Sequence, residues 1–138
     1  MYNVPPMMVE LTAFMKLSDE EFDRIVKRAI RRIPQVIRRH LDNIVISVRK
    51  RPSRNMMKEM KLPSGEALLG LFQGIPLIER SVTSPPLFPD TILLFQEPLE
   101  KTCETREELE EQIRITVVHE VAHFIGIGEE RLEELGYG

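Results

Sequence analysis

The sequence has little of several residue types that mark whole classes of protein. It holds one cysteine, Cys103, in 138 residues, which excludes an internal disulfide framework and suits a reducing, cytoplasmic setting. Tryptophan is absent, aromatic residues make up 6% of the chain, and the basic segments carry no interleaved aromatics for base stacking. No apolar run approaches the length of a membrane span, and the first residues do not resemble a signal peptide. We therefore expect neither a nucleic-acid nor a membrane partner.

Charge is distributed unevenly along the chain. The net charge is −3, yet residues 1–62 hold 14 Lys and Arg against 7 Asp and Glu, whereas residues 63–138 hold 5 against 15. Most arginines of the basic half fall on the polar side of a predicted amphipathic helix, so we expect a solvated face rather than a nucleic-acid interface. The length predicts one domain over residues 1–138, with residues 1–17 irregular. We expect a monomer, with a partner protein as the alternative.

Two capping boxes predict where helices begin. Ser18 and Glu21 open an amphipathic helix, which Pro34 ends before a second helix over about 34–41. Thr105 and Glu108 open a long helix that runs to about Ile125. A short final helix is predicted over 129–135. The apolar stripe of the first helix comprises Phe22, Ile25, Val26, Ala29, Ile30 and Ile33.

Short runs rich in β-branched and apolar residues predict three strands, Ile44–Val48, Leu68–Phe72 and Thr91–Phe95. Asp42-Asn43 reads as a turn, Leu77 and Ile78 as a short return strand, Ser81 to Asp90 as a loop, and Pro98 as the stop of the last strand. We expect a loop over 49–61, whose methionines form a short capping helix rather than a flap near the site. The order of elements predicts an α+β fold in which helices pack on one side of a small twisted sheet.

The stretch that suggests chemistry is His119-Glu120-Val-Ala-His123. In a helix, residues four apart lie on one face, so His119 and His123 can present two imidazoles to one metal ion. Glu120 lies about 100° around the helix from His119, where its carboxylate can reach a water on that ion without binding the metal. Gln112 and Thr116 fall in the same stripe, and the other faces are apolar, which predicts a buried helix with a polar stripe.

A third ligand is predicted after the helix. Gly126 can end the helix in a left-handed turn, which would bring Glu129 back toward the histidines. Two histidines, one carboxylate and an open position are typical of a catalytic zinc site, although other divalent transition metals also suit these ligands. The rival carboxylates for the third position are Glu130, Glu133 and Glu134.

From His119 to Gly136 the sequence resembles the bacterial minimal zincin-like metallopeptidases, with the pattern H-E-x-x-H-x-x-G-x-x-E. Three upstream segments, 41–48, 68–76 and 89–99, also look like that family's strands. The resemblance covers most of residues 18–138 and implies a zincin core reduced to its catalytic minimum. It differs from the metzincins, which have histidine at the position of Glu129 and a later methionine turn.

The resemblance implies zinc-dependent hydrolysis of a peptide or protein substrate. It assigns His119 and His123 as metal ligands and Glu120 as general base. The third ligand of the family is usually aspartate, so Glu129 is a departure that lengthens this ligand by one methylene. Zincins commonly bind peptide along a sheet edge, which 68–72 or 91–95 would supply. The alternatives are a non-catalytic zinc-binding module and, less favoured, a metal-dependent RNA endonuclease, whose pattern uses three histidines.

Overall fold

The computed structural model describes residues 15–62, 67–74 and 89–136. The helices are α2 (Asp19–Arg31), α3 (Gln35–Arg38), α4 (Arg54–Met60), α5 (Gln96–Lys101), α6 (Arg106–Ile125) and α7 (Glu129–Glu134), with a 3-10 helix η1 (Arg39–Asn43). The strands are β1 (Ile44–Arg49), β2 (Gly70–Gln73) and β3 (Asp90–Phe95). This mixture of elements confirms the predicted α+β class. In the described ranges, no helix is both long and apolar enough to cross a membrane.

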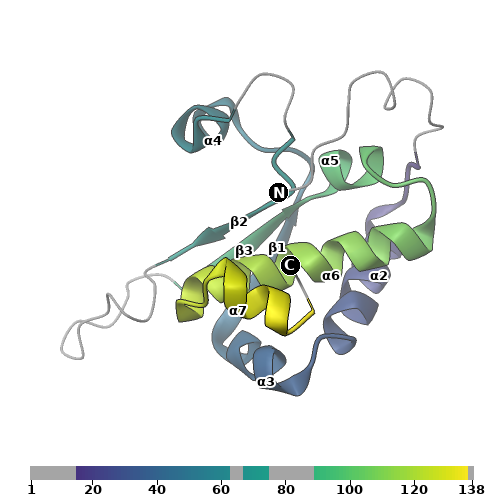
Figure 1. The fold of residues 1–138 in the computed structure, drawn as a ribbon. Coiled ribbons are helices and arrows are strands. Elements are labelled where there is room, and N and C mark those ends of the chain that lie inside the picture. Colours follow the sequence, from purple (N-terminus) through teal and green to yellow (C-terminus); the bar gives the residue numbers. More distant parts are fainter. Residues whose placement is uncertain (1–14, 63–66, 75–88, 137–138) are drawn as a thin grey trace.

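The three strands form one mixed sheet in the order β1-β3-β2. β1 runs parallel to β3, and β2 runs antiparallel to it. β3 is therefore the central strand, and β2 lies at an edge of the described sheet. Figure 1 shows the long helix α6 beside the sheet, with α2 packed along it and the short α7 folded back near its C-terminal end.

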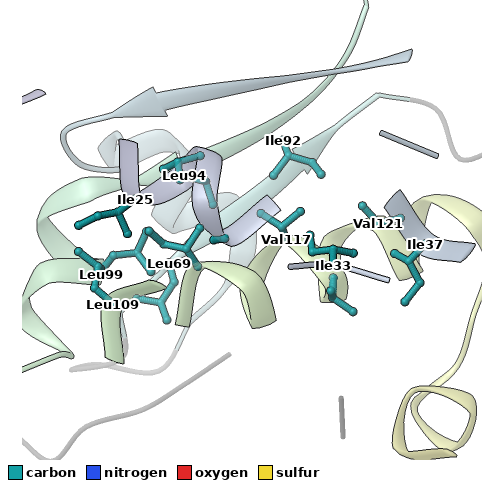
Figure 2. Packing of buried hydrophobic residues seen from close by; sticks show 14 of the residues in the cluster. Ile25, Ile33, Ile37, Leu69, Ile92, Leu94, Leu99, Leu109, Val117 and Val121 are labelled. Carbon is teal, nitrogen blue, oxygen red and sulfur yellow. The ribbon is translucent and has the colours of Figure 1, made fainter. Parts of the chain in front are cut away.

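The main core lies between the sheet and the pair formed by α2 and α6. Figure 2 shows Ile25 of α2, Leu94 of β3 and Leu109 of α6 meeting in one cluster of buried side chains. The predicted stripe of α2 is buried at Phe22, Ile25, Val26 and Ala29, as its spacing indicated. The same packing buries most of the apolar residues of α6, because they face α2 on one side and the strands on the other.

A smaller cluster covers the opposite face of the sheet, where the sequence had suggested helices on one side alone. Leu93 and Phe95 alternate with the core residues of β3 and so point the other way, where Met56 and Met57 of α4 pack against them. The expected loop over 49–61 thus contains a helix, and the preferred interpretation of its methionines as a short capping helix is confirmed. Figure 1 shows α4 on the far side of β2 from α6.

Several other local predictions need correction. The residues at Asp42-Asn43 end η1 rather than forming a simple turn. Pro98 follows the end of β3 as expected, but it lies within the first turn of α5. Proline is tolerated there because the N–H groups of a first turn form no hydrogen bond within the helix. The predicted return strand at Leu77 and Ile78, and nearly all of the predicted loop from Ser81, lie outside the described residues.

The uneven charge distribution is partly explained by contacts between α2 and α6. Arg28 and Arg32 of the basic half both contact Glu110 of the acidic half, at 3.2 and 2.8 Å. Arg32 also contacts Glu111 at 3.3 Å. Ion pairs between the two halves of the chain therefore link α2 to α6 at the surface.

Candidate active site

Helix α6 begins and ends where the sequence predicted. The Thr105 hydroxyl accepts a hydrogen bond from the Glu108 N–H at 3.1 Å, which caps the first turn. At the other end Gly126 adopts φ 78° and ψ 25°, a left-handed conformation that glycine takes without strain. The Ile127 N–H then donates to the Ala122 carbonyl at 2.9 Å, so the chain reverses and α7 starts at Glu129.

The polar stripe of α6 lines one cavity. All five predicted residues of the stripe, Gln112, Thr116, His119, Glu120 and His123, border a cavity of about 440 Å³. The apolar flanks of the stripe had predicted that it is buried. This prediction is wrong for the stripe as a whole. The side chain of His123 is 64% exposed, whereas that of Glu120 is 17% exposed. The two histidines and the glutamate therefore face an open cleft, where a substrate can approach them.

Glu120 is held in a fixed position within this cleft. Its Oε2 accepts a hydrogen bond from the backbone N–H of Phe72 in β2 at 3.0 Å. The same oxygen lies 3.9 Å from Nδ1 of His123. Burial raises the pKa of the Glu120 carboxyl above its ordinary value of 4.5, against the opposing effects of His123 and of the Phe72 hydrogen bond. A carboxyl with raised proton affinity beside two imidazoles is well suited to acid-base chemistry.

β2 approaches α6 unusually closely at Gly70. A Cβ at this position would lie 2.6 Å from Cγ2 of Thr116, so glycine is required for the strand to lie against the helix. Further along the strand, the Phe72 ring contacts the Phe124 ring, with centroids 5.2 Å apart. The isolated glycine within the predicted strand was the sequence signal for this close approach.

The orientation of β2 directs its backbone toward the cleft. The Leu69 carbonyl accepts a hydrogen bond from the Phe95 N–H at 3.0 Å. Along an antiparallel strand, the backbone N–H and C=O groups of successive residues point alternately toward the partner strand and away from it. The backbone groups of Gly70 and Phe72 consequently point away from β3, which agrees with the Phe72 bond to Glu120. Two strands were predicted as a possible substrate edge. The prediction for β3 is wrong because β3 is central, whereas β2 lies at an edge of the sheet formed by the described residues.

The side chains that face the cleft fit a zinc ion in chemical type. His119 and His123 lie one turn apart on α6 and border the same cavity, and imidazole is a common zinc ligand. Within the described part of the chain, no group of three His, Cys, Asp or Glu side chains is assembled as a complete ligand set. Glu129 starts α7, but its side chain is not described, so its role as third ligand stays a prediction.

The rival carboxylates lie on the same short helix. Glu134 contacts Arg131 at 2.8 Å, with both side chains more than 60% exposed, so this carboxylate is engaged at the surface. Glu130 and Glu133 are also exposed. Of the four carboxylates, Glu129 at the start of α7 is the nearest in sequence to the Gly126 turn.

Sequence reasoning missed one wall of the cavity. Met60, Leu62 and Ile115 line it together with Leu68 and Leu69 of the proposed edge segment, and the first three were not assigned to the site. Met60 and Leu62 come from α4 and the residues that follow it, a segment expected to be a polar loop. Their only signal was the run of methionines in 56–60, which had suggested a flap as the disfavoured alternative.

A sheet edge placed beside a helix that carries H-E-x-x-H, with both histidines and the glutamate facing one cleft, is a zincin-like arrangement. The chain belongs to the zincin-like metallopeptidase family, whose sequence profile matches residues 41–138. The resemblance noted from the sequence is thus confirmed at the level of the family, which is one of metallopeptidases that generally use zinc.

The fold is similar to that of a conserved hypothetical protein from Thermo thermophilus. The TM-score is 0.51 at 20% sequence identity, and the similarity covers 86% of this chain and 97% of that chain. This similarity supports the fold and carries no information on the reaction. No curated protein matches the chain in sequence.

Proposed function

We propose that this protein is a zinc-dependent peptidase in which Glu120 is the general base. The observation that carries the proposal is the position of Glu120. Its carboxylate is anchored to the backbone of the edge strand at 3.0 Å and borders the same cavity as both histidines. A base must lie within reach of both the metal-bound water and the substrate backbone, and Glu120 borders the cavity that both would occupy.

His119 and His123 would hold the zinc ion, with Glu129 as the predicted third ligand. When bound, zinc supplies Lewis-acid chemistry, which acidifies a water to a pKa of about 7 and polarises the substrate carbonyl. Because the side chain of His123 is exposed, the proposed zinc position would be accessible from solvent. Because two ligands come from adjacent turns of one rigid helix, their spacing is set before the metal binds.

Glu120 would move the proton. Its carboxylate would accept a proton from the attacking water and deliver it to the amine that leaves the cleaved peptide bond. The Phe72 N–H holds Oε2, which leaves the second oxygen of the carboxylate for this transfer. Burial raises the pKa of Glu120, and this brings its proton affinity closer to that of a water activated at neutral pH.

The substrate would bind as an added strand along β2. The backbone groups of Gly70 point away from β3 and toward the side of the strand where α6 lies, so an extended peptide pairing with Gly70 would pass beside Glu120. Peptide pairing at a sheet edge uses backbone hydrogen bonds, which are common to all sequences. Selectivity would then have to come from side-chain contacts in the cavity.

The test is cleavage of a mixed peptide library by the zinc-loaded protein and by its Glu120→Gln variant. Glutamine keeps an oxygen that can accept from Phe72 but cannot take a proton, so we expect a loss of about 10²- to 10⁴-fold in kcat/KM. Glu104→Gln is the matched control, because this exposed carboxyl lies before the far end of α6 and should leave the rate unchanged. Undiminished cleavage by Glu120→Gln would contradict the proposed base.

A further inference from the structure

The cavity beside the histidines has two chemically different walls. One wall is the polar stripe of α6, which ends at the two histidines. The other wall is apolar and comes from four separate parts of the fold: the end of α4, the residue after its C-cap, the two residues before β2 and α6 itself. Its residues are Met60, Leu62, Leu68, Leu69 and Ile115. The apolar wall has no role in holding a metal or moving a proton.

Three of the apolar residues present free surface to the cavity. Met60 is 42% exposed, and Leu62 and Ile115 are partly exposed. Leu68 and Leu69 are 4% and 2% exposed and pack into the two core clusters. Within the apolar wall, the accessible surface therefore belongs to Met60, Leu62 and Ile115, which border the same cavity.

The backbone is arranged to place these residues. Met56 and Met57 anchor α4 on the far face of the sheet, so the end of the helix is fixed. Lys61 then adopts a left-handed conformation with φ 50° and ψ 42°, which is unfavourable for a residue with a Cβ. This turn ends α4 so that Met60 and Leu62, on either side of it, both border the cavity.

The apolar surface also lies close to the reactive groups. Ile115 precedes His119 by four residues on α6, so the two side chains are neighbours on one helix face. Thr116 stands in the same relation to Glu120. A peptide side chain that contacts Ile115 would therefore be held about one helical turn from the groups that would perform the chemistry.

We propose that Met60, Leu62 and Ile115 form a subsite that selects peptides with a bulky apolar side chain, such as leucine, methionine or phenylalanine, next to the scissile bond. This inference rests on the proposed function for its placement beside a cleaved bond. The cavity volume of about 440 Å³ lies within the usual range for binding sites, which is roughly 300–1,000 Å³.

A charged side chain is disfavoured at this subsite. Among the described residues that line the cavity there is no lysine or arginine, so an acidic side chain beside Met60 would lose water without gaining a cation. Among the same residues, a basic side chain would find its only carboxylate at Glu120, which is required for proton transfer. Methionine adapts its shape to different apolar groups, so we expect tolerance among large apolar residues rather than selection of one.

Binding without cleavage tests the subsite directly. Acetylated tetrapeptides that differ in one residue, leucine, alanine or aspartate, are titrated into the metal-free protein while the methyl signals of its methionines are followed by NMR. We expect the leucine peptide to bind roughly 10-fold or more tightly than the alanine peptide and to shift the signal of Met60. The signal of Met57, which packs on the far face of the sheet, is the internal control.

Two variants make this comparison specific. Met60→Ala should reduce the preference for leucine over alanine about 5- to 10-fold, and Met60→Leu should retain it. Val45→Ala is the matched control, because Val45 is 48% exposed on β1 and does not border the cavity. Equal binding of the leucine and alanine peptides, or a preference unchanged in Met60→Ala, would overturn the subsite.

Cleavage separates this inference from the proposed function. The zinc-loaded protein should cleave library peptides with an apolar preference at one position beside the scissile bond. Cleavage with no such preference overturns the subsite and leaves the peptidase proposal intact. Absence of cleavage from every peptide counts against the peptidase proposal, and the binding titration alone then decides whether the subsite exists.

Discussion

The backbone N–H of Phe72 donates a hydrogen bond to the carboxylate of Glu120 at 3.0 Å, across a separation of 48 residues in the sequence. This bond joins the edge strand β2 to the helix that carries the two histidines. The Phe72 ring also contacts Phe124, one turn further along α6. One residue of β2 thus fixes both the proposed base and the packing of the strand that would receive substrate.

The position of Glu120 should destabilise the metal-free protein. Burial raises its pKa, so at neutral pH the folded state holds a carboxylate in a site that favours the protonated form. Glu120→Gln removes this charge and should increase the free energy of unfolding in urea at pH 7 in the presence of a chelator. The increase should shrink as pH falls through the raised pKa and vanish below the ordinary value of 4.5, where both states are protonated. A Glu120→Gln variant less stable than wild type at pH 7 would contradict this account.

The close contact between Gly70 and Thr116 predicts a rescue. In Gly70→Ala the new methyl group would lie 2.6 Å from Cγ2 of Thr116, so the strand must shift, at a cost of about 1–3 kcal/mol. Thr116→Ser removes that methyl group and keeps the hydroxyl that donates to the Gln112 carbonyl at 2.8 Å. The double variant should therefore recover part of the stability lost in Gly70→Ala, as measured by thermal unfolding. Additive losses would show that β2 and α6 are not in contact here.

The left-handed conformation of Lys61 predicts opposite effects for a glycine substitution at this C-cap and one inside α4. Lys61→Gly relieves the unfavourable conformation, although glycine also increases the conformational entropy of the unfolded chain. We expect a net gain of roughly 0.5–1 kcal/mol in the free energy of unfolding. Lys58→Gly, inside α4, should instead lose about 1 kcal/mol, since glycine disfavours a helix interior. Urea unfolding of the two variants compares them, and a loss in both would mean that Lys61 is not left-handed.

The ion pairs of Glu111 predict that stability depends on pH in the acid range. The hydrogen bond from Arg114, with a further contribution from Arg32, lowers the pKa of Glu111. A lowered pKa stabilises the folded state above the ordinary value of 4.5, and this benefit is lost as pH falls through the lowered pKa. Glu111→Gln should lower stability at pH 7 by up to about 1 kcal/mol, because the side chain is 39% exposed. The difference should close in acid, and Glu59→Gln on α4 is the control.

Local signals in the sequence predicted α6 and its ends well. The hydroxyl of Thr105 needs only the next turn to cap a helix, and Gly126 needs only its own conformational freedom to end one. The alignment of His119, Glu120 and His123 on one face also follows from helical geometry alone. Features that depend on a few consecutive residues can therefore be predicted from those residues.

Features that depend on distant pairing were not predicted. The residues of β3 do not indicate that a strand pairs with it on each side, so the prediction of β3 as a substrate edge was wrong. The anchoring of Glu120 by Phe72 and the apolar wall at Met60 arise because separate segments meet at the edge of β2. The openness of the cleft around His123 has the same origin, since a helical wheel cannot show which flanks of α6 remain uncovered.

The most direct test of the central claim is the zinc content of the purified protein, measured together with the affinity for added zinc by calorimetry. We expect one zinc per chain in wild type, loss of binding in the His119→Ala/His123→Ala double variant, and weakened binding in Glu129→Ala. Glu120→Gln should still bind zinc, because Glu120 is proposed as a base rather than a ligand. A wild-type protein that takes up no zinc even when it is supplied in excess would contradict the account and leave the stripe of α6 as a polar surface without catalytic function.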